Sequence, residues 1–96
     1  MTGQGDGKCE GTAYSWHPAR DCGADARVPD AGVIVLIHGL GLTRATWAGQ
    51  IVALSQHHDV LAYDLVGHGE SDLPFGTPDL TLYSVQLFQL LDRLGI

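Results

Sequence analysis

The chain has 96 residues, 45% of them hydrophobic and 17% charged, and a formal net charge of −6. This length allows one small domain at most, and the composition is typical of a globular rather than a disordered protein. The negative charge disfavours nucleic acids and anionic membranes as partners, because both bind basic surfaces. No apolar run approaches the length of a membrane span.

The first 31 residues carry weak structural signals. Met1–Gly11 is glycine-rich and polar and lacks the hydrophobic core of a signal peptide, so we expect a mobile leader and a cytoplasmic location. Thr12–Trp16 alternates loosely and predicts a short strand. Prolines, glycines and charges in His17–Gly32 indicate a long surface loop or a weak hairpin. Residues 1–31 are therefore expected to be a leader with short strands, and residues 32–96 the main folded unit.

Cys9 and Cys22 are the two cysteines of the sequence. They lie far apart and form no CxxC pair, so we expect free thiols rather than a disulfide. A metal site built from both cysteines and His17 is disfavoured, because three isolated ligands in a loop lack tight spacing. This pattern predicts no metal and no cofactor.

Two apolar runs on either side of a helical segment predict a βαβ unit. Val33–Ile37 is apolar at every position, as expected of a buried parallel strand. Apolar residues at helical spacing predict an amphipathic helix over Trp47–His57. Val60–Tyr63 is the second predicted strand. The helical crossover between the strands favours parallel pairing in one right-handed unit.

A second helix is predicted over Thr81–Leu94, followed by Gly95 at the position that glycine commonly occupies after a helix. No charged residue occurs in Leu80–Leu91. Because a surface helix normally shows a polar face, this sequence is suited to burial over much of the helix circumference. Two strands and one helix can hardly provide that burial, so we expect the helix to lack part of its cover. The predicted fold class is α/β, with a parallel βαβ core and an incomplete sheet.

A glycine-containing loop follows each predicted strand: His38-Gly-Leu-Gly41 after the first, and Asp64-Leu-Val-Gly-His-Gly-Glu-Ser71 after the second. In open α/β sheets, ligands bind beyond the carboxyl ends of parallel strands, so both loops are candidates for the functional site. Gly67 and Gly69 permit a compact turn. The side chains of Asp64 and Ser71 can close that turn by hydrogen bonds to the backbone.

The order of strand, HGxG loop, helix containing Trp47, strand and DxxGxGxS loop resembles the α/β-hydrolase family between its third and fourth strands. The resemblance covers residues 32–96 and implies the N-terminal part of an α/β-hydrolase sheet. It also implies hydrolysis of an ester or related acyl bond in a small molecule, through a serine nucleophile in a full-length form.

The same resemblance implies roles for individual residues of the first glycine loop. The Leu40 N–H would be one donor of an oxyanion hole, which stabilises the negative charge that develops in acyl transfer. Gly39 would let the backbone turn without a Cβ clash, Gly41 would shape the loop, and His38 would fix it by hydrogen bonding. A tight turn without any donor role is the alternative for the two glycines.

Asp64, His68 and Ser71 carry the letters of a catalytic triad, but three residues crowded on one short loop are not expected to reach triad geometry. A role for His38 as the base is also disfavoured, because the base of the resembled family comes much later in the chain. The sequence has no GxSxG nucleophile elbow. We therefore expect a truncated portion that lacks nucleophile, acid and base.

Two other functions compete with hydrolysis. A dinucleotide-binding unit would use Gly39 and Gly41 for phosphate and Asp64 for ribose, but Arg44 occupies the third glycine position and the loop is long. A non-catalytic interaction module is the second alternative. Val33–Ile37 would form an open apolar sheet edge if the neighbouring strand is absent, which predicts edge-to-edge self-association.

Overall fold

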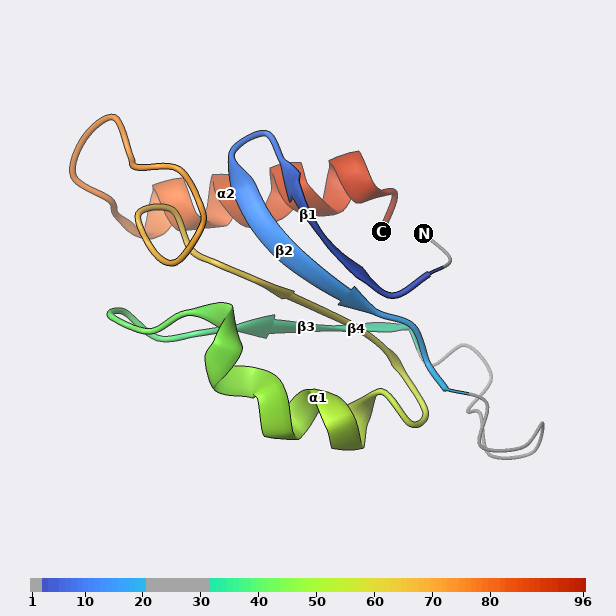
Figure 1. Cartoon of the computed structure of the whole chain (residues 1–96). Coiled ribbons are helices and arrows are strands. Elements are labelled where there is room, and N and C mark those ends of the chain that lie inside the picture. Colours follow the sequence, from blue (N-terminus) through green and yellow to red (C-terminus); the bar gives the residue numbers. More distant parts are fainter. Residues whose placement is uncertain (1–2, 21–31) are drawn as a thin grey trace.

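The computed structural model describes residues 3–20 and 32–96. The described residues form a four-stranded mixed sheet in the order β1-β2-β4-β3, with α1 and α2 on opposite sides (Figure 1). The strands are β1 (Gly5–Cys9), β2 (Thr12–His17), β3 (Val33–Ile37) and β4 (Asp59–Tyr63). The helices are the 3-10 helix η1 (Arg44–Trp47), α1 (Ala48–Leu54) and α2 (Leu80–Leu94). The α/β fold class is confirmed.

The mobile leader predicted over Met1–Gly11 is wrong for strand β1, which pairs antiparallel with β2 across a two-residue turn. Both turn residues, Glu10 and Gly11, have positive φ angles of 47° and 82°. Two such residues are what a type I′ hairpin turn requires. β1 lies at the sheet edge and is mostly exposed. It therefore carries no periodic apolar signal in its sequence.

The predicted βαβ unit is confirmed, because β3 and β4 pair in parallel over their full length. The crossover helix is shorter than expected. It begins as the 3-10 turn η1, and α1 ends at Leu54 rather than near His57. The amides of Gln56 and His57 bond to carbonyls three residues back, so the α-helical pattern gives way to turns before the predicted end.

Helix α2 is capped at both ends as its sequence suggests. The Asp79 carboxylate accepts a hydrogen bond from the Leu82 amide at 2.8 Å, which satisfies one free amide of the first turn. Gly95 follows the last turn with a φ of 74°. The predicted second helix is therefore confirmed within one residue at its start and at its end.

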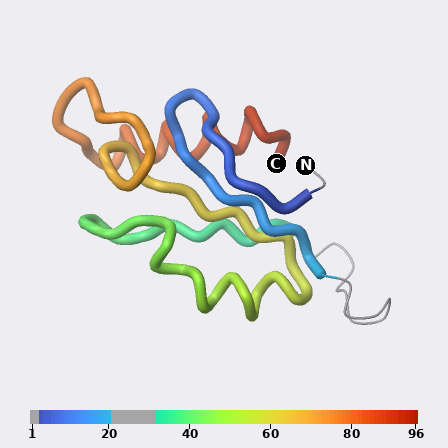
Figure 2. Tube along the Cα trace, viewed as in Figure 1, coloured from blue at the N-terminus to red at the C-terminus, as the bar shows by residue number. Residues whose placement is uncertain are grey.

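The main core lies between α2 and the facing side of β2 and β4. It consists of Trp16, Leu61, Tyr63, Leu65 and Leu90. Burial raises the pKa of Tyr63 to about 12. The β1–β2 hairpin and α2 are far apart in sequence but lie side by side (Figure 2). An ion pair of 2.8 Å between Glu10 and Arg93 joins the turn of the hairpin to the last turn of α2.

The open sheet edge predicted at Val33–Ile37 and the incomplete cover predicted for the second helix are confirmed among the described residues, whereas full burial of β3 is not found. β3 forms the sheet edge opposite β1, its side chains are partly buried, and Ile37 is 45% exposed. In α2, Leu80 and Phe88 are largely exposed, and the buried residues are Gln86 and Leu90. The reason is geometric: the described strands cover only one edge of β3, and the sheet covers only one side of α2.

Some expectations fall partly outside the described residues. Cys9 is a free cysteine, whereas Cys22 and residues 21–31 of the predicted loop lie outside the described ranges. None of the described helices combines the length and apolar character that a membrane span requires. The cytoplasmic location stays a prediction.

Candidate functional site

The two glycine-containing loops meet at one corner of the molecule. They follow β3 and β4, which are parallel neighbours, so both loops leave the sheet at the carboxyl ends of these two strands (Figure 2). We term residues 38–43 the first loop and residues 64–72 the second loop. Two hydrogen bonds of 3.0 Å join them: the Gly41 amide donates to His68 Nε2, and the Leu65 amide donates to His38 Nε2.

The first loop, as described, has backbone amides without an acceptor, and the Leu40 amide to which the sequence assigns a donor role is one of them. Gly41 has a φ of 83°, a left-handed value that favours glycine, and its amide is taken by His68. The Leu40 amide has no acceptor in the part of the chain that the structure describes. Leu40 as a residue is 73% exposed. The residue that carries this amide therefore lies on the surface of the corner.

Gly39 does not have the steric role that the sequence predicts. It has no positive φ, and a Cβ at this position would make an ordinary contact with Leu42 at 3.9 Å. The turn is closed instead by the Leu42 amide, which donates to the Gly39 carbonyl at 3.2 Å. The conformational requirement for glycine in this loop thus falls on Gly41.

Both histidines of the corner are occupied at both ring nitrogens. His38 is buried; its Nε2 accepts the Leu65 amide and its Nδ1 lies 2.7 Å from the Gly39 carbonyl oxygen. His68 accepts at Nε2 in the same way, and its Nδ1 lies 3.1 Å from a backbone carbonyl of its own loop. Neither imidazole has a nitrogen free to act as a general base.

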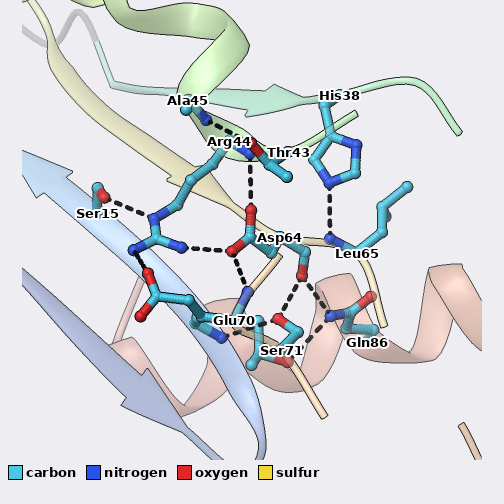
Figure 3. A network of polar contacts seen from close by, with 12 residues as sticks. Ser15, His38, Thr43, Arg44, Ala45, Asp64, Leu65, Glu70, Ser71 and Gln86 are labelled. Atoms are coloured by element: carbon cyan, nitrogen blue, oxygen red, sulfur yellow. Dashed lines mark hydrogen bonds and ion pairs between the residues drawn. The ribbon is translucent and has the colours of Figure 1, made fainter. Parts of the chain in front are cut away.

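Asp64 anchors the corner through a buried polar network (Figure 3). Its side chain is 1% exposed and accepts from the Arg44 guanidinium, from the Arg44 amide at 2.7 Å and from the Glu70 amide at 3.0 Å. The guanidinium also contacts the Glu70 carboxylate and the Ser15 hydroxyl, each at 2.9 Å. A Cβ on Gly69, whose φ is 50°, would overlap the Asp64 carboxylate. This position therefore requires glycine.

Asp64 and Arg44 each shift the pKa of the other toward its charged form. Burial alone would raise the pKa of Asp64, but the amides of Arg44 and Glu70 and the Arg44 charge outweigh it. The pKa of Asp64 is therefore held below its usual value of 3.8. Burial alone would also lower the pKa of Arg44, but Glu70 and Asp64 outweigh it and raise that pKa. Both groups are charged at neutral pH, and their ion pair ties η1 to the second loop.

Ser71 and Gln86 fasten the second loop to the rest of the fold. The Ser71 hydroxyl donates to the Asp64 carbonyl at 2.7 Å and accepts the Ala13 amide at 2.9 Å. Gln86, on α2, donates to the same carbonyl at 3.0 Å and to a β2 hydroxyl at 3.1 Å. Its side-chain oxygen accepts the Val66 amide at 3.0 Å. The loop is thus bonded to both a strand and a helix.

Asp64, His68 and Ser71 do not assemble into a triad. Within the described structure, their side chains make no hydrogen bond with one another, because each is bonded to the partners given above. The Ser71 hydroxyl already has a donor and an acceptor partner. It is therefore placed as a structural group of the second loop and not as a nucleophile.

Sequence reasoning missed two residues of this corner, Arg44 and Gln86. Gln86 lies one helical turn before the buried Leu90, so it is a lone polar residue on the apolar stripe of α2. That pattern could have marked it as a buried hydrogen-bonding group. Arg44 is the only Arg or Lys between Arg27 and Arg93. Its charge is complementary to the acidic second loop, which was the available signal.

The corner does not suit a dinucleotide. The Arg44 amide at the start of η1 already donates to the Asp64 carboxylate, which occupies the place that a phosphate would take. That carboxylate is buried and paired, so it is not open to a ribose. Among the described residues, no group of three or more His, Cys, Asp or Glu side chains could hold a metal ion. What the corner offers is the Leu40 amide, without an acceptor in the described structure, on a scaffold held by many hydrogen bonds.

Comparison with known protein families and sequences gives a consistent result. A family model described as alpha/beta hydrolase fold matches residues 32–96. A protein named carbamate hydrolase RutD from Stutzerimonas stutzeri is 44% identical over 70 residues, which are 71% of this chain and 26% of the relative. The uncharacterized protein Rv2715 of Mycobacterium tuberculosis is 39% identical over 71 residues, or 73% of this chain and 21% of the relative.

Solved structures show the same fold. The enol-lactonase of Burkholderia xenovorans matches with a TM-score of 0.72 and 32% identity, over 96% of this chain and 34% of the enol-lactonase. A hydrolase from Pseudomonas aeruginosa matches with a TM-score of 0.69 and 25% identity, over 99% of this chain and 34% of that hydrolase. The epoxide hydrolase VrEH1 of Vigna radiata, at 20% identity over 97% of this chain and 28% of its own, shares the fold with a TM-score of 0.77.

The open sheet, with a loop beyond the carboxyl end of each of two parallel strands, places the chain in the α/β class of folds. Within that class, the chain belongs to the α/β hydrolase fold family, which its residues 32–96 match. The chain spans 26% and 21% of the two curated relatives and 34% of the two hydrolase structures named first.

Proposed function

We propose that this chain forms the oxyanion-hole side of a hydrolase site that cleaves an ester or a related acyl bond in a small molecule. The Leu40 N–H is the proposed donor to the oxyanion. In this proposal, a serine nucleophile, a base and an acid act from outside the 96 residues. The 96 residues alone would therefore not catalyse the reaction.

The observation that carries this proposal is the unpaired Leu40 amide. Acyl transfer develops negative charge on the carbonyl oxygen, and N–H donors fixed in advance stabilise that charge most effectively. The adjacent Gly41 amide is held by His68, so it fixes the turn rather than the substrate. Because the groups around Leu40 are already bonded to each other, its N–H needs little rearrangement to act as a donor.

The names of several relatives support acyl chemistry. They include a carbamate hydrolase, an enol-lactonase and an (E)-2-((N-methylformamido)methylene)succinate hydrolase of Acinetobacter baylyi, the last 45% identical over 38 residues. Carbamates and lactones both react by attack on a carbonyl carbon, which is the step that needs an oxyanion hole. The epoxide hydrolase shares the fold alone at 20% identity and does not bear on the substrate.

A chimera with a longer relative tests the role of Leu40. In the enol-lactonase of Burkholderia xenovorans, the segment that aligns with residues 32–96 is replaced by those residues, and lactone hydrolysis is measured. Leu40→Pro removes the backbone N–H and is expected to lower kcat roughly a hundred- to a thousandfold, with a smaller effect on KM. Leu40→Ala keeps the N–H and serves as the matched control, with kcat close to that of the parent chimera.

Circular dichroism accompanies the kinetics, because proline can also distort the loop. An unchanged kcat in a well-folded Leu40→Pro chimera would remove Leu40 from the site. A well-folded parent chimera without hydrolysis would show that this corner cannot serve the reaction. The 96-residue chain itself is expected to give no turnover of nitrophenyl acetate. Turnover above buffer that Ser71→Ala abolishes would instead place the nucleophile within the second loop.

A further inference from the structure

His38 and His68 each accept a hydrogen bond from the loop to which the other histidine belongs. We term these two cross-loop hydrogen bonds the brace. His38 belongs to the first loop and accepts the Leu65 amide of the second loop at 3.0 Å. His68 belongs to the second loop and accepts the Gly41 amide of the first loop at 3.0 Å. The two ring centroids are 5.1 Å apart. The same chemical contact is therefore made twice, once from each side of the corner.

The hydrogen-bond partners assign one protonation state to each ring. An amide N–H can only donate, so each Nε2 must present a lone pair. The proton of the neutral ring then lies on Nδ1, which faces a carbonyl oxygen in both cases: Gly39 at 2.7 Å and Val66 at 3.1 Å. All four contacts are satisfied together only when both imidazoles are neutral and protonated at Nδ1.

The charged groups around the pair do not stabilise an imidazolium. The titratable groups on the neighbouring segments are Arg44 on η1, the neutral Tyr63 at the end of β4, and Asp64, Glu70 and Asp72 on the second loop. Arg44 pairs with Asp64 and Glu70, and Asp72 pairs with Lys8 at 2.7 Å. β3, the remainder of the first loop and the Gln86 side chain of α2 add no charge. Among the described residues, no carboxylate bonds to either imidazole.

A proton added to either Nε2 would place an N–H against another N–H. The cross-loop bond would then be lost, and two charged rings 5.1 Å apart would repel each other. Histidine is the side chain whose charge ordinarily changes between about pH 5 and 8. The two cross-loop hydrogen bonds therefore depend on the neutral form of both rings.

We propose that His38 and His68 are positioning residues that hold the first loop, with the Leu40 N–H, in place only while both imidazoles are neutral. Their protonation releases the loop and disables the oxyanion donor on the acid side. This inference rests on the proposed function for its catalytic consequence. The brace itself is a property of the 96-residue chain and can be measured without any activity.

Nitrogen-15 NMR of the uniformly labelled chain tests the brace directly. Long-range spectra of both imidazoles at pH 8 are expected to show neutral rings protonated at Nδ1. On titration to pH 5, the amide signals of Gly41 and Leu65 are expected to move with the midpoints of the imidazole signals. The proposal would be overturned by rings protonated at Nε2, or by a Gly41 amide signal that does not move while the His68 imidazole signals do.

Variants separate the acceptor from the shape of the side chain. His68→Gln can place an oxygen near the position of Nε2, whereas His68→Phe keeps a flat ring without an acceptor. The Gly41 amide of His68→Phe is expected to exchange with solvent roughly two- to tenfold faster, as for the loss of one hydrogen bond. His68→Gln should restore protection and remove its pH dependence. His57→Gln, at an exposed histidine after α1, is the control and should leave Gly41 unchanged.

Hydrogen-exchange mass spectrometry of the first loop gives a second readout that tolerates self-association. After correction for the intrinsic pH dependence of exchange, the wild-type loop should lose protection below neutral pH. A loop equally protected at pH 8 and pH 5 would contradict the brace even if the His68 variants did not fold. In the active chimera, the same brace predicts a fall in kcat on the acid side that His68→Gln reduces. A brace seen by NMR without this kinetic effect would overturn the catalytic part alone.

Discussion

The loop corner is held by buried polar contacts, whereas the free β3 edge and the outer face of α2 expose apolar side chains. At the corner, buried polar groups from β2, both loops, η1 and α2 bond to one another, including a carboxylate that is 1% exposed. At the β3 edge and on α2, large apolar side chains such as Ile37, Val85 and Phe88 are exposed. The polar groups of the corner are satisfied by hydrogen bonds and an ion pair, whereas the β3 edge and the outer face of α2 present apolar surface to solvent.

This difference shows which part of the molecule carries its specificity. A buried polar network demands that every member be satisfied, so it fixes one arrangement of the loops. Apolar surface is stabilised by any cover of suitable shape. We therefore expect substitutions at the corner to affect folding strongly, and substitutions at the edge to affect association more than folding.

The largest effect is expected for Asp64→Asn. The substitution leaves the Arg44 guanidinium, 14% exposed, without its buried counter-charge. Removing one partner of a buried ion pair costs roughly 3 to 5 kcal/mol, which is a large share of the stability of a small domain. Urea unfolding followed by circular dichroism measures the change. Glu70→Gln removes the exposed partner of the same guanidinium and should cost no more than about 1 kcal/mol. Equal effects of the two substitutions would contradict the contrast.

Acid should remove the same ion pair gradually. The pKa of Asp64 is lower in the folded state than its usual value of 3.8, so ionised Asp64 stabilises the fold at every pH above that value. This stabilisation falls as the pH drops below about 4 and is gone once the folded carboxyl is protonated. The free energy of unfolding, measured from pH 7 to pH 2, should fall more steeply for the wild type than for Asp64→Asn. Parallel curves would show that Asp64 does not contribute.

An intermediate effect is expected for Gln86→Leu. Leucine keeps the bulk of the side chain but leaves the Val66 amide and part of the Asp64 carbonyl without their partner. An unsatisfied buried group costs roughly 1 to 3 kcal/mol. Val85→Leu, on the exposed face of the same helix, is the matched control and should change the free energy of unfolding by less than about 0.5 kcal/mol. If Gln86→Leu were neutral, the second loop would not depend on α2.

The sequence predicted the elements whose signals are periodic. Val33–Ile37, Val60–Tyr63 and the second helix have apolar runs or helical spacing, and all three lie where expected, with Gly95 after the helix. β1 could not be found in this way, because it is an exposed edge strand and its only signal is the turn at Glu10 and Gly11. Periodicity reports burial, so elements that bury little surface escape it.

The position of the candidate site could be predicted from the sequence, but its hydrogen bonds could not. The two loops could be placed at one edge, because parallel strands end together. The bonds of Arg44 and Gln86 join positions 20 to 74 residues apart, and no local pattern encodes such distances. His68 was assessed only as a member of a local triad. Its bond to Gly41 depends on how closely the two loops approach, which only the folded chain determines.

The smallest effect on folding is expected at the free edge, with Ile37→Lys. β3 presents the unpaired side of its backbone, and its side chains are all apolar. Such an edge pairs readily with another strand, and a lysine is among the residues that prevent this. We expect the wild-type chain to self-associate through β3, so its sedimentation coefficient should rise with concentration. Ile37 is 45% exposed, so Ile37→Lys should lower that association while changing the free energy of unfolding by about 0.5 kcal/mol or less.

Phe75→Lys is the control for this experiment, because Phe75 is a fully exposed apolar residue on the loop before α2. It lines one hollow with Glu10 and Gly11 of the β1–β2 turn, and β1 is the sheet edge opposite β3. If association ran through general apolar contact, both lysines would reduce it equally. Association through β3 should respond to Ile37→Lys alone, and amide exchange over Val33–Ile37 should be slower at high than at low concentration. A wild-type monomer at all concentrations, with β3 amides strongly protected, would show that the edge is closed within one chain.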